Sequence, residues 1–218
     1  MTNKVNLLEL NRQAWNKIAY NYEKHRPKWL DKHNPLFEYF CANLPKSSYV
    51  LDLGSGTGLP YAKSLIERGF KVLGIDLSKN MVNIAQKNVP GAKFIQLSMT
   101  KLDYKNRFEG MLSSFSMLSL DPKQIKEVSI RVAKALKKEG LFYLSLNEPP
   151  EEFLDIDNYT YTIIEIMGQK MYSRPYTEEE ISKIFSPLGM KLLKLHREIQ
   201  VSDLFGEEHT ISFVFKKI

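Results

Sequence analysis

The stretch that decides the fold is Val50-Leu51-Asp52-Leu53-Gly54-Ser55-Gly56-Thr57-Gly58. An apolar, strand-forming run leads directly into three glycines spaced two residues apart, and a helix-forming segment follows from Pro60. Glycine lets the backbone turn sharply, and the missing side chains let a ligand approach the main chain. The stretch therefore predicts a strand, a ligand-binding turn and a helix.

The chain after this stretch continues to alternate between strand and helix patterns. Further strands are predicted at 71–75, 93–97, 110–115 and 141–146, and helices at 60–68, from Ser78 through Ala85, and from Asp121 to a stop at Gly140. Lys137 and Lys138 are expected in the last turn of that third helix, where cations oppose the helix dipole. This alternation predicts a parallel sheet with helices on both faces.

The two ends of the chain follow other patterns. Apolar residues at helical spacing predict a helix over 7–22, and a short helix over 36–44 follows it. After the fifth strand, residues 159–173 predict a hairpin around Gly168-Gln169. Thr177 and Glu180 then form a capping box that begins a helix, and two strands at about 190–199 and 210–217 end the chain.

These elements together predict an α/β fold. We expect a seven-stranded, mostly parallel, doubly wound sheet with a C-terminal antiparallel strand, an N-terminal helical extension and a small insertion after strand five. A chain of 218 residues suits one domain. Its expected parts are a helical cap over 1–45, a binding core over 46–147, an insertion over 148–176, and a C-terminal helix with strands over 177–218.

Composition narrows the class of protein. Hydrophobic residues make up 43% and charged residues 26%, as in ordinary globular proteins. The apolar runs are too short to cross a bilayer, and the lone Cys41 rules out an intramolecular disulfide, so a cytoplasmic location without membrane contact is expected. The net charge of +6 comes from scattered lysines and not from a dense basic stripe, which argues against a nucleic-acid partner.

Asp76 narrows the class of ligand that the glycine turn is expected to bind. It ends the second predicted strand, close to the offset of about 20 residues at which an acid accepts hydrogen bonds from a ribose. Capping of the following turn is the alternative role. A dinucleotide fingerprint needs a third small residue, but Leu59 or Tyr61 stands there, depending on the frame. The pattern therefore indicates a single nucleoside and disfavours a nicotinamide oxidoreductase.

Two motifs carry a resemblance to a known family. Val50–Gly58 resembles the first motif of class I (Rossmann-like) S-adenosylmethionine (SAM)-dependent methyltransferases. Gly74-Ile75-Asp76-Leu77-Ser78-Lys79-Asn80-Met81 resembles their post-first-strand motif. The resemblance extends over about residues 10–147 in order and spacing. It implies SAM as the cofactor and S-adenosylhomocysteine (SAH) as the product.

The resemblance also implies which residues bind the cofactor. Asp52 and Gly54–Gly58 would line its methionine portion, Asp76 would hold both ribose hydroxyls, and Leu77 and Met81 would flank the adenine. For Met81, simple core packing is an almost equal alternative. The implied cofactor set is Tyr22, Asp52, Gly54, Ser55, Gly56, Thr57, Gly58, Asp76, Leu77, Met81, Ser98, Met99, Thr100, Ser114 and Phe115.

Two members of this set need separate comment. Tyr22 resembles the N-terminal tyrosine that reaches the cofactor's carboxylate in related small-molecule methyltransferases, with a core role as the alternative. Ser98 stands where the family often has an acid that receives the adenine amino group. A hydroxyl accepts a hydrogen bond more weakly than a carboxylate does, so a lower cofactor affinity is expected.

The acceptor site is expected between the N-terminal helix and the insertion. The candidate substrate-binding residues are Tyr20, Ser116, Tyr172, Arg174 and Tyr176. Arg174 has two possible roles, a clamp on a carboxylate or phosphate and an ion pair with Glu178 or Glu179. The insertion is too short to be a recognition domain, which favours a small-molecule acceptor. The acceptor's identity and the oligomeric state stay open.

No catalytic residue or metal site is predicted. The sulfonium of SAM already activates the methyl group, so the protein mainly has to align an in-line attack and exclude water. The four histidines, at 25, 33, 196 and 209, are scattered and lack metal-ligand spacing. An RNA or protein methyltransferase and a non-catalytic SAM-binding or partner-activating protein are the alternative functions.

Overall fold

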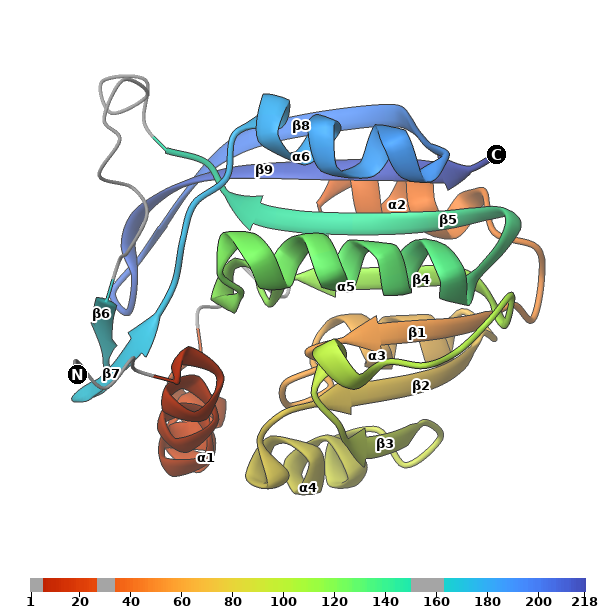
Figure 1. Ribbon diagram of the computed structural model, residues 1–218. Helices are drawn as coiled ribbons and strands as arrows, with labels where there is room; N and C mark the ends of the chain where they lie inside the picture. The colour runs from red at the N-terminus through yellow and green to blue at the C-terminus, as the bar shows by residue number, and fades with distance from the viewer. Residues whose placement is uncertain (1–5, 27–33, 150–162) are drawn as a thin grey trace.

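The structure is a computed structural model that describes residues 6–26, 34–149 and 163–218. A seven-stranded sheet with the strand order β3-β2-β1-β4-β5-β9-β8 forms its centre (Figure 1). The strands are β1 (Tyr49–Leu53), β2 (Lys71–Asp76), β3 (Lys93–Gln96), β4 (Phe108–Ser114), β5 (Leu136–Asn147), β8 (Met190–Ser202) and β9 (Gly206–Lys217). The first five are parallel, and β9 runs antiparallel to both of its neighbours. The predicted fold class is confirmed.

Helices cover both faces of this sheet (Figure 1). On one face lie α2 (Pro35–Ala42), α3 (Tyr61–Glu67) and α4 (Lys79–Asn88), and on the other lie α5 (Pro122–Ala135) and α6 (Glu178–Phe185). Side chains of a strand point alternately to its two faces. Phe142 of β5 therefore packs in the core beneath α5 and α6, whereas Tyr143 packs beneath α2 and α3. Both side chains are fully buried.

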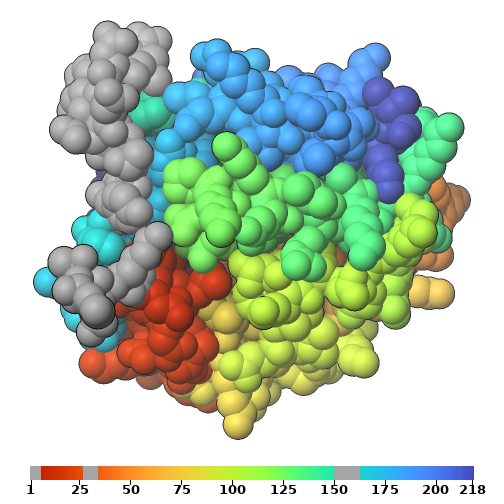
Figure 2. Space-filling model, in the orientation of Figure 1, coloured from red at the N-terminus to blue at the C-terminus, as the bar shows by residue number. Residues whose placement is uncertain are grey.

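The N-terminal helix α1 (Leu7–His25) covers neither face. It lies at the carboxyl ends of β1 and β2, between α4 and the hairpin of β6 (Ile163–Ile166) and β7 (Gln169–Tyr172) (Figure 1). Ala19 packs on Met81 of α4, and Ile18 packs on Ile166 and Met171 of the hairpin. In the space-filling view the surface of α1 directly adjoins that of the segment around α4 (Figure 2). Among the described residues no helix has the length and apolarity needed to cross a membrane.

The end of α5 differs from the sequence prediction. The helix stops at Ala135, and Leu136 adopts an extended conformation and pairs with Phe108 of β4. Leu136 is fully buried, and the amides of Asn106 and Arg107 donate to the carbonyls of Lys134 and Ala135. Core burial and these bonds end the helix before the predicted stop at Gly140. Lys137 and Lys138 accordingly lie at the start of β5 and not in a helical turn.

Two hairpins also differ in detail. Met167 and Gly168 both have positive φ and join Ile166 to Gln169, so the tight turn is centred one residue earlier than predicted. The part of this predicted hairpin before residue 163 lies outside the described residues. Strands β8 and β9 are longer than predicted, because pairing continues as far as Ser202 and Gly206.

Candidate functional site

A cleft lies at the carboxyl ends of β1, β2 and β4, with α1 along its side. This is where ligands bind in doubly wound sheets, since the strand order reverses between β1 and β4: the chain passes from β1 to β2 and β3 on one side and then crosses to β4 on the other. The empty space of the cleft is about 1150 Å³, measured out to its open mouth. The predicted residues that line it are Tyr22, Asp52, Gly54, Ser55, Gly56, Thr57, Asp76, Leu77, Met81, Ser98, Met99, Ser114, Phe115 and Ser116.

The glycine turn forms the floor of the cleft. Gly54, Gly56 and Gly58 have φ of +71°, +51° and +79°, which glycine adopts without strain. The amide of Gly54 donates to the carbonyl of Ile75 at 2.8 Å and joins the turn to the end of β2. A β-carbon on Gly54 would lie 2.3 Å from that of Ser116. Position 54 therefore has no room for any side chain, and the main chain itself faces a ligand.

Asp76 lies beside this turn and is held by it. Its Oδ2 accepts a hydrogen bond from the amide of Gly56 at 3.0 Å, and its Oδ1 accepts one from the amide of Ser78 at 2.8 Å. Burial raises the pKa of Asp76 to about 6, although these amide donors act against the rise. Asp76 thus has the capping role that the sequence left open, and its carboxylate also lines the cleft.

Asp52 is the second acid of the cleft and has different surroundings. Its residue surface is only 4% exposed, and no hydrogen bond to its carboxyl group is present among the described residues. Burial, and secondarily the nearby Asp76, raise the pKa of Asp52 to about 8. The described lining residues include no lysine, arginine or histidine, so the cleft has an acidic character that suits a cationic ligand.

The pKa of Asp52 predicts how stability depends on pH. The folded chain holds this proton more tightly than the unfolded chain, so the contribution to stability is lost as the pH rises from 3.8 to about 8. In Asp52→Asn this loss is absent. Without ligand, the melting temperature of the variant minus that of the wild type should therefore increase by at least about 3 °C from pH 5 to pH 9. A constant difference in melting temperature would contradict the assignment.

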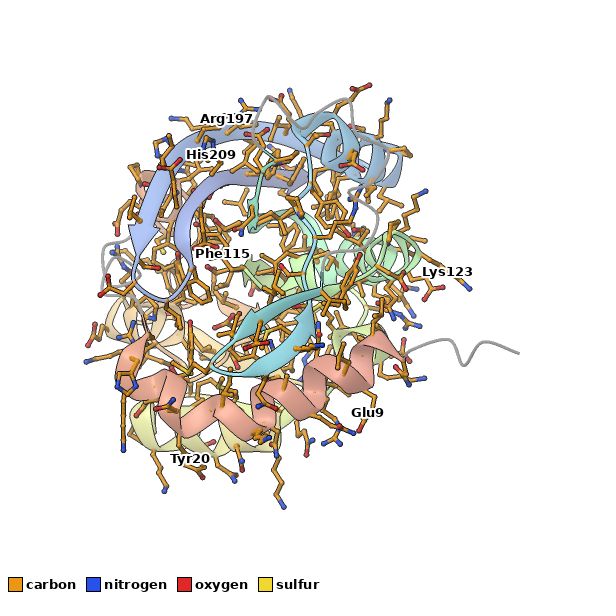
Figure 3. The ribbon with its side chains drawn as sticks, turned by 90° about the vertical axis from the view of Figure 1, so that its left-hand side faces the viewer. Glu9, Tyr20, Phe115, Lys123, Arg197 and His209 are labelled. Atoms are coloured by element: carbon orange, nitrogen blue, oxygen red, sulfur yellow. The ribbon has the colours of Figure 1, made fainter. Side chains whose placement is uncertain are left out.

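The loop after β4 forms the next wall of the cleft. Phe115 has a φ of +50°, a strained conformation for a residue with a side chain, and its amide donates to the carbonyl of Ser145 at 3.0 Å. Ser116 Oγ donates to the carbonyl of Leu53 at 2.5 Å and contacts Ser113 Oγ at 2.7 Å. These contacts of Ser116 connect the end of β1 to the end of β4. Phe115 lies toward the centre of the molecule (Figure 3).

Helix α1 supplies the opposite wall. The rings of Trp15 and Tyr22 meet edge to face with 5.3 Å between their centroids, and both line the cleft. Burial raises the pKa of Tyr22 to about 12, so its phenol stays neutral. Asn16 Oδ1 accepts hydrogen bonds from Ser78 Oγ at 3.2 Å and from the amide of Asn80 at 3.0 Å. These bonds fix α1 to the segment that follows Asp76.

Asn11 fixes the same helix on its other side. Its Nδ2 donates to the carbonyls of Tyr172 at 2.9 Å and Ser119 at 3.3 Å, and its Oδ1 accepts from the amide of Tyr172 at 2.7 Å. Asn11 is buried and lines the cleft as well. The helix, the β6–β7 hairpin and the loop after β4 therefore meet at one asparagine.

The structure does not bring the remaining predicted residues to the cleft. Gly58 packs near Val89 and Phe94, and Thr100 contacts Ser98 Oγ at 2.8 Å in a short 3₁₀ helix over Met99–Lys101. Tyr20 is 53% exposed and projects from the outer side of α1 (Figure 3). Its place on the helix is opposite to that of Trp15.

Arg174 and the two tyrosines near it are buried behind the loop after β4. Arg174 pairs with Glu180 at 2.6 Å, and not with the Glu178 or Glu179 that the sequence suggested. Its guanidinium lies 4.3 Å from the ring centroid of Tyr176, and both residues line a groove between α5 and α6. Tyr172 is fully buried. This placement differs from the acceptor role predicted for all three residues.

Several residues of the cleft were not among the predicted ones. They are Leu8, Asn11, Trp15, Leu59, Pro60, Tyr61, Leu97, Ser119 and Leu120. Leu8 and Trp15 belong to the helix predicted over 7–22, but an apolar helix face has the same sequence pattern whether it covers a core or a ligand. Tyr61 begins α3 directly after the glycine turn, and this position was the available signal for it.

Comparison with known proteins agrees with this geometry. Residues 50–140 match the family described as Methyltransferase domain. A protein of Geobacillus sp. (strain WCH70) whose name describes it as a methyltransferase is 29% identical over 149 residues, which are 66% of this chain and 55% of that protein. The tRNA (uracil(54)-C(5))-methyltransferase of Pyrococcus horikoshii is 29% identical over 147 residues, 66% of this chain and 34% of its own length. The chain thus spans about half or less of these relatives.

A solved structure matches over the whole chain. The 1,6-didemethyltoxoflavin-N1-methyltransferase of Burkholderia thailandensis, determined with its substrate and SAH, superposes with a TM-score of 0.72 at 20% identity. The match covers 100% of this chain and 92% of that one. The chain therefore shares the fold of this methyltransferase, and residues 50–140 match the methyltransferase-domain family.

Proposed function

We propose that this protein transfers a methyl group from SAM to a small-molecule acceptor. The observation that carries the proposal is the position of Asp76, which lies at the end of β2 and is hydrogen-bonded to the glycine turn in the main cleft. A carboxylate at this place can accept hydrogen bonds from both ribose hydroxyls of a nucleoside. The matching methyltransferase domain covers the same two elements.

The other cleft residues suit the remaining parts of SAM. Leu77, Met81 and Met99 provide apolar surface for the adenine, and Ser98 offers a hydroxyl near it. Asp52 and the open main chain at Gly54 would hold the methionine portion, whose ammonium group needs an acidic partner. When SAM is bound, its sulfonium supplies an electrophilic methyl group.

The chain's own part in the reaction is to orient the acceptor and exclude water. Trp15 from α1 and Leu120 from the loop after β4 would pack on the acceptor and keep the site dry, while Tyr22 from α1 would reach the carboxylate of the cofactor. The described lining has no histidine or lysine that would act as a general base. Alignment for in-line attack is therefore the main contribution that these residues make to the rate.

A small acceptor is supported by how the chain compares with larger enzymes. The Pyrococcus tRNA methyltransferase has about two thirds of its length outside the match, whereas the Burkholderia enzyme, which acts on a small molecule, matches over nearly its full length. Nucleic-acid binding draws on clustered basic side chains, and the described cleft has none. An RNA acceptor would reveal itself by strongly salt-dependent RNA binding.

Isothermal titration calorimetry with SAM, SAH and NADH tests the proposal. We expect saturable binding of the first two ligands at a single site. We expect no binding of NADH, because Leu59 or Tyr61 stands where a pyrophosphate-binding fingerprint needs a third small residue. Turnover is then sought by following SAH formation with a panel of small metabolites. Absence of SAM and SAH binding would overturn the proposed function.

Ser98→Asp should strengthen cofactor binding. Ser98 lines the cleft and caps the short 3₁₀ helix by accepting the amide of Thr100 at 3.3 Å, a role that aspartate also fills. A carboxylate would accept the adenine amino group more strongly, and we expect SAH affinity to rise about 3- to 10-fold, or about 1 kcal/mol. Ser98→Ala is the control and should bind more weakly than wild type. Equal affinity of all three proteins would show that position 98 does not meet the adenine.

A further inference from the structure

We infer that Asp52 is protonated in the empty cleft and gives up its proton when the positively charged cofactor enters. Cofactor binding is then coupled to the release of about one proton. This inference rests on the proposed function, because it takes SAM as the ligand of the cleft. It adds a selecting role for Asp52, which favours ligands that carry a positive charge next to the nucleoside.

The two acids of the cleft have opposite surroundings although they lie on neighbouring strands. Asp52 pairs in register with Gly74, two residues before Asp76. Asp76 accepts two backbone hydrogen bonds, which stabilise its ionised form. Asp52 is buried and accepts none from the described residues. Where two close carboxyl groups differ in this way, the one without donors retains its proton.

None of the described residues that line the cleft compensates a negative charge on Asp52. The titratable side chains that face the described cleft are Asp76 from β2, Tyr22 from α1 and Tyr61 from α3. Asp76 is itself acidic, and burial raises the pKa of both tyrosines, so they remain neutral. A second buried carboxylate close to Asp76 would be costly without a cation. The raised pKa of Asp52 agrees with this geometry.

Binding of the cofactor would favour the ionised form of Asp52 over the protonated form. SAM brings a sulfonium and an α-ammonium group, and either charge near Asp52 stabilises the carboxylate. The O–H bond of the Asp52 carboxyl group then breaks, its electron pair stays on the oxygen, and the proton leaves to the solvent buffer. The result is a buried charge pair in which the protein keeps one negative charge opposite the cofactor.

Calorimetry in buffers of different ionisation enthalpy measures this proton directly. Binding of SAM at pH 6.5 is titrated in phosphate, imidazole and Tris, since the slope of observed enthalpy against buffer enthalpy gives the number of protons released. At this pH the α-amino group of the free ligand is already charged. We expect release of about one proton with SAM and with SAH, which retains the ammonium group. 5′-Methylthioadenosine has the same nucleoside thioether without either charge and should release none.

Variants and pH assign the proton to Asp52. Asp52→Asn should reduce the release with SAM to a small fraction, whereas Asp103→Asn, a matched change at an exposed acid that pairs with Lys134, should leave it unchanged. In wild type the net release should also decrease as the pH rises from 6.5 through about 8, where Asp52 is ionised before binding. Asp52→Asn gives the separate contribution of the free ligand's α-amino group, which loses its own proton in the same range. SAM binding without buffer dependence at pH 6.5, or release that persists in Asp52→Asn, would overturn the inference. Absence of SAM binding would instead contradict the proposed function.

Discussion

Asp76→Ala is expected to weaken SAM and SAH binding by at least about 100-fold. The carboxylate would accept hydrogen bonds from two ribose hydroxyls, and bonds to a charged group contribute about 1.5–3 kcal/mol each. The variant also leaves the amide of Gly56 without its 3.0 Å acceptor, which loosens the turn beneath the cofactor. Calorimetric titration at pH 8, where Asp76 of the wild type is ionised, measures the change.

Asp76→Asn separates the two contributions. Its amide oxygen can still accept one backbone hydrogen bond, so the turn is kept while the charge is lost. We expect an affinity between those of wild type and Asp76→Ala, together with a melting temperature close to that of the wild type without ligand. In the wild type, affinity should also fall as the pH drops through about 6, because protonation removes the better acceptor. Affinity that is unchanged in Asp76→Ala would exclude the ribose role.

The sheet could be predicted from the sequence because local signals and burial agreed there. The apolar run before Gly54 and the acid at the end of the second strand required two adjacent parallel strands, and the structure has this pairing. The N-terminal caps of two helices could also be predicted from local sequence. Ser78 accepts the amide of Met81, and Thr177 forms its capping box with Glu180. Short-range hydrogen bonds of this kind depend on few residues and need no knowledge of tertiary contacts.

The end of α5 could not be predicted because tertiary contacts decide it. The segment around Lys137 and Gly140 has good helix-ending chemistry, yet Leu136 leaves the helix to enter the core beside β4. The amides of Asn106 and Arg107, about 28 residues away in the chain, occupy the terminal carbonyls. A helix pattern contains no information about such a distant partner.

The residues of the candidate site were likewise predicted where local signals decide their place and missed where tertiary contacts do. Residues in the last positions of their strands, such as Asp52, Asp76 and Ser114, were brought together as expected, since the carboxyl ends of parallel strands meet at one edge. The wall made by α1 was foreseen only in part, because Asn11 and Asn16 act through hydrogen bonds to remote segments. The sequence suggested Arg174 as a ligand for an anionic acceptor, but its side chain forms an ion pair with Glu180.

Gly54→Ala should be among the most destabilising single-methyl changes in this chain. A residue with a side chain at the φ of +71° costs about 1–2 kcal/mol, and the new β-carbon would lie 2.3 Å from that of Ser116. Overpacking of this kind adds about 1–3 kcal/mol. We expect a loss of about 3–4 kcal/mol in the free energy of unfolding, a melting temperature about 10 °C lower, and cofactor binding too weak to measure. Chemical denaturation and calorimetry measure these effects.

Gly69→Ala isolates the part that comes from the backbone. Gly69 has a φ of +83° but no atom within 4 Å of its added β-carbon, so this variant should lose only about 1–2 kcal/mol. Adding Ser116→Gly to Gly54→Ala removes the clash and should recover part of the lost stability, although Leu53 then loses the bond from Ser116 Oγ. Non-additivity of the two changes measures the contact between turn and loop. If Gly54→Ala cost no more than Gly69→Ala, the two strand ends would not meet as closely as this structure shows.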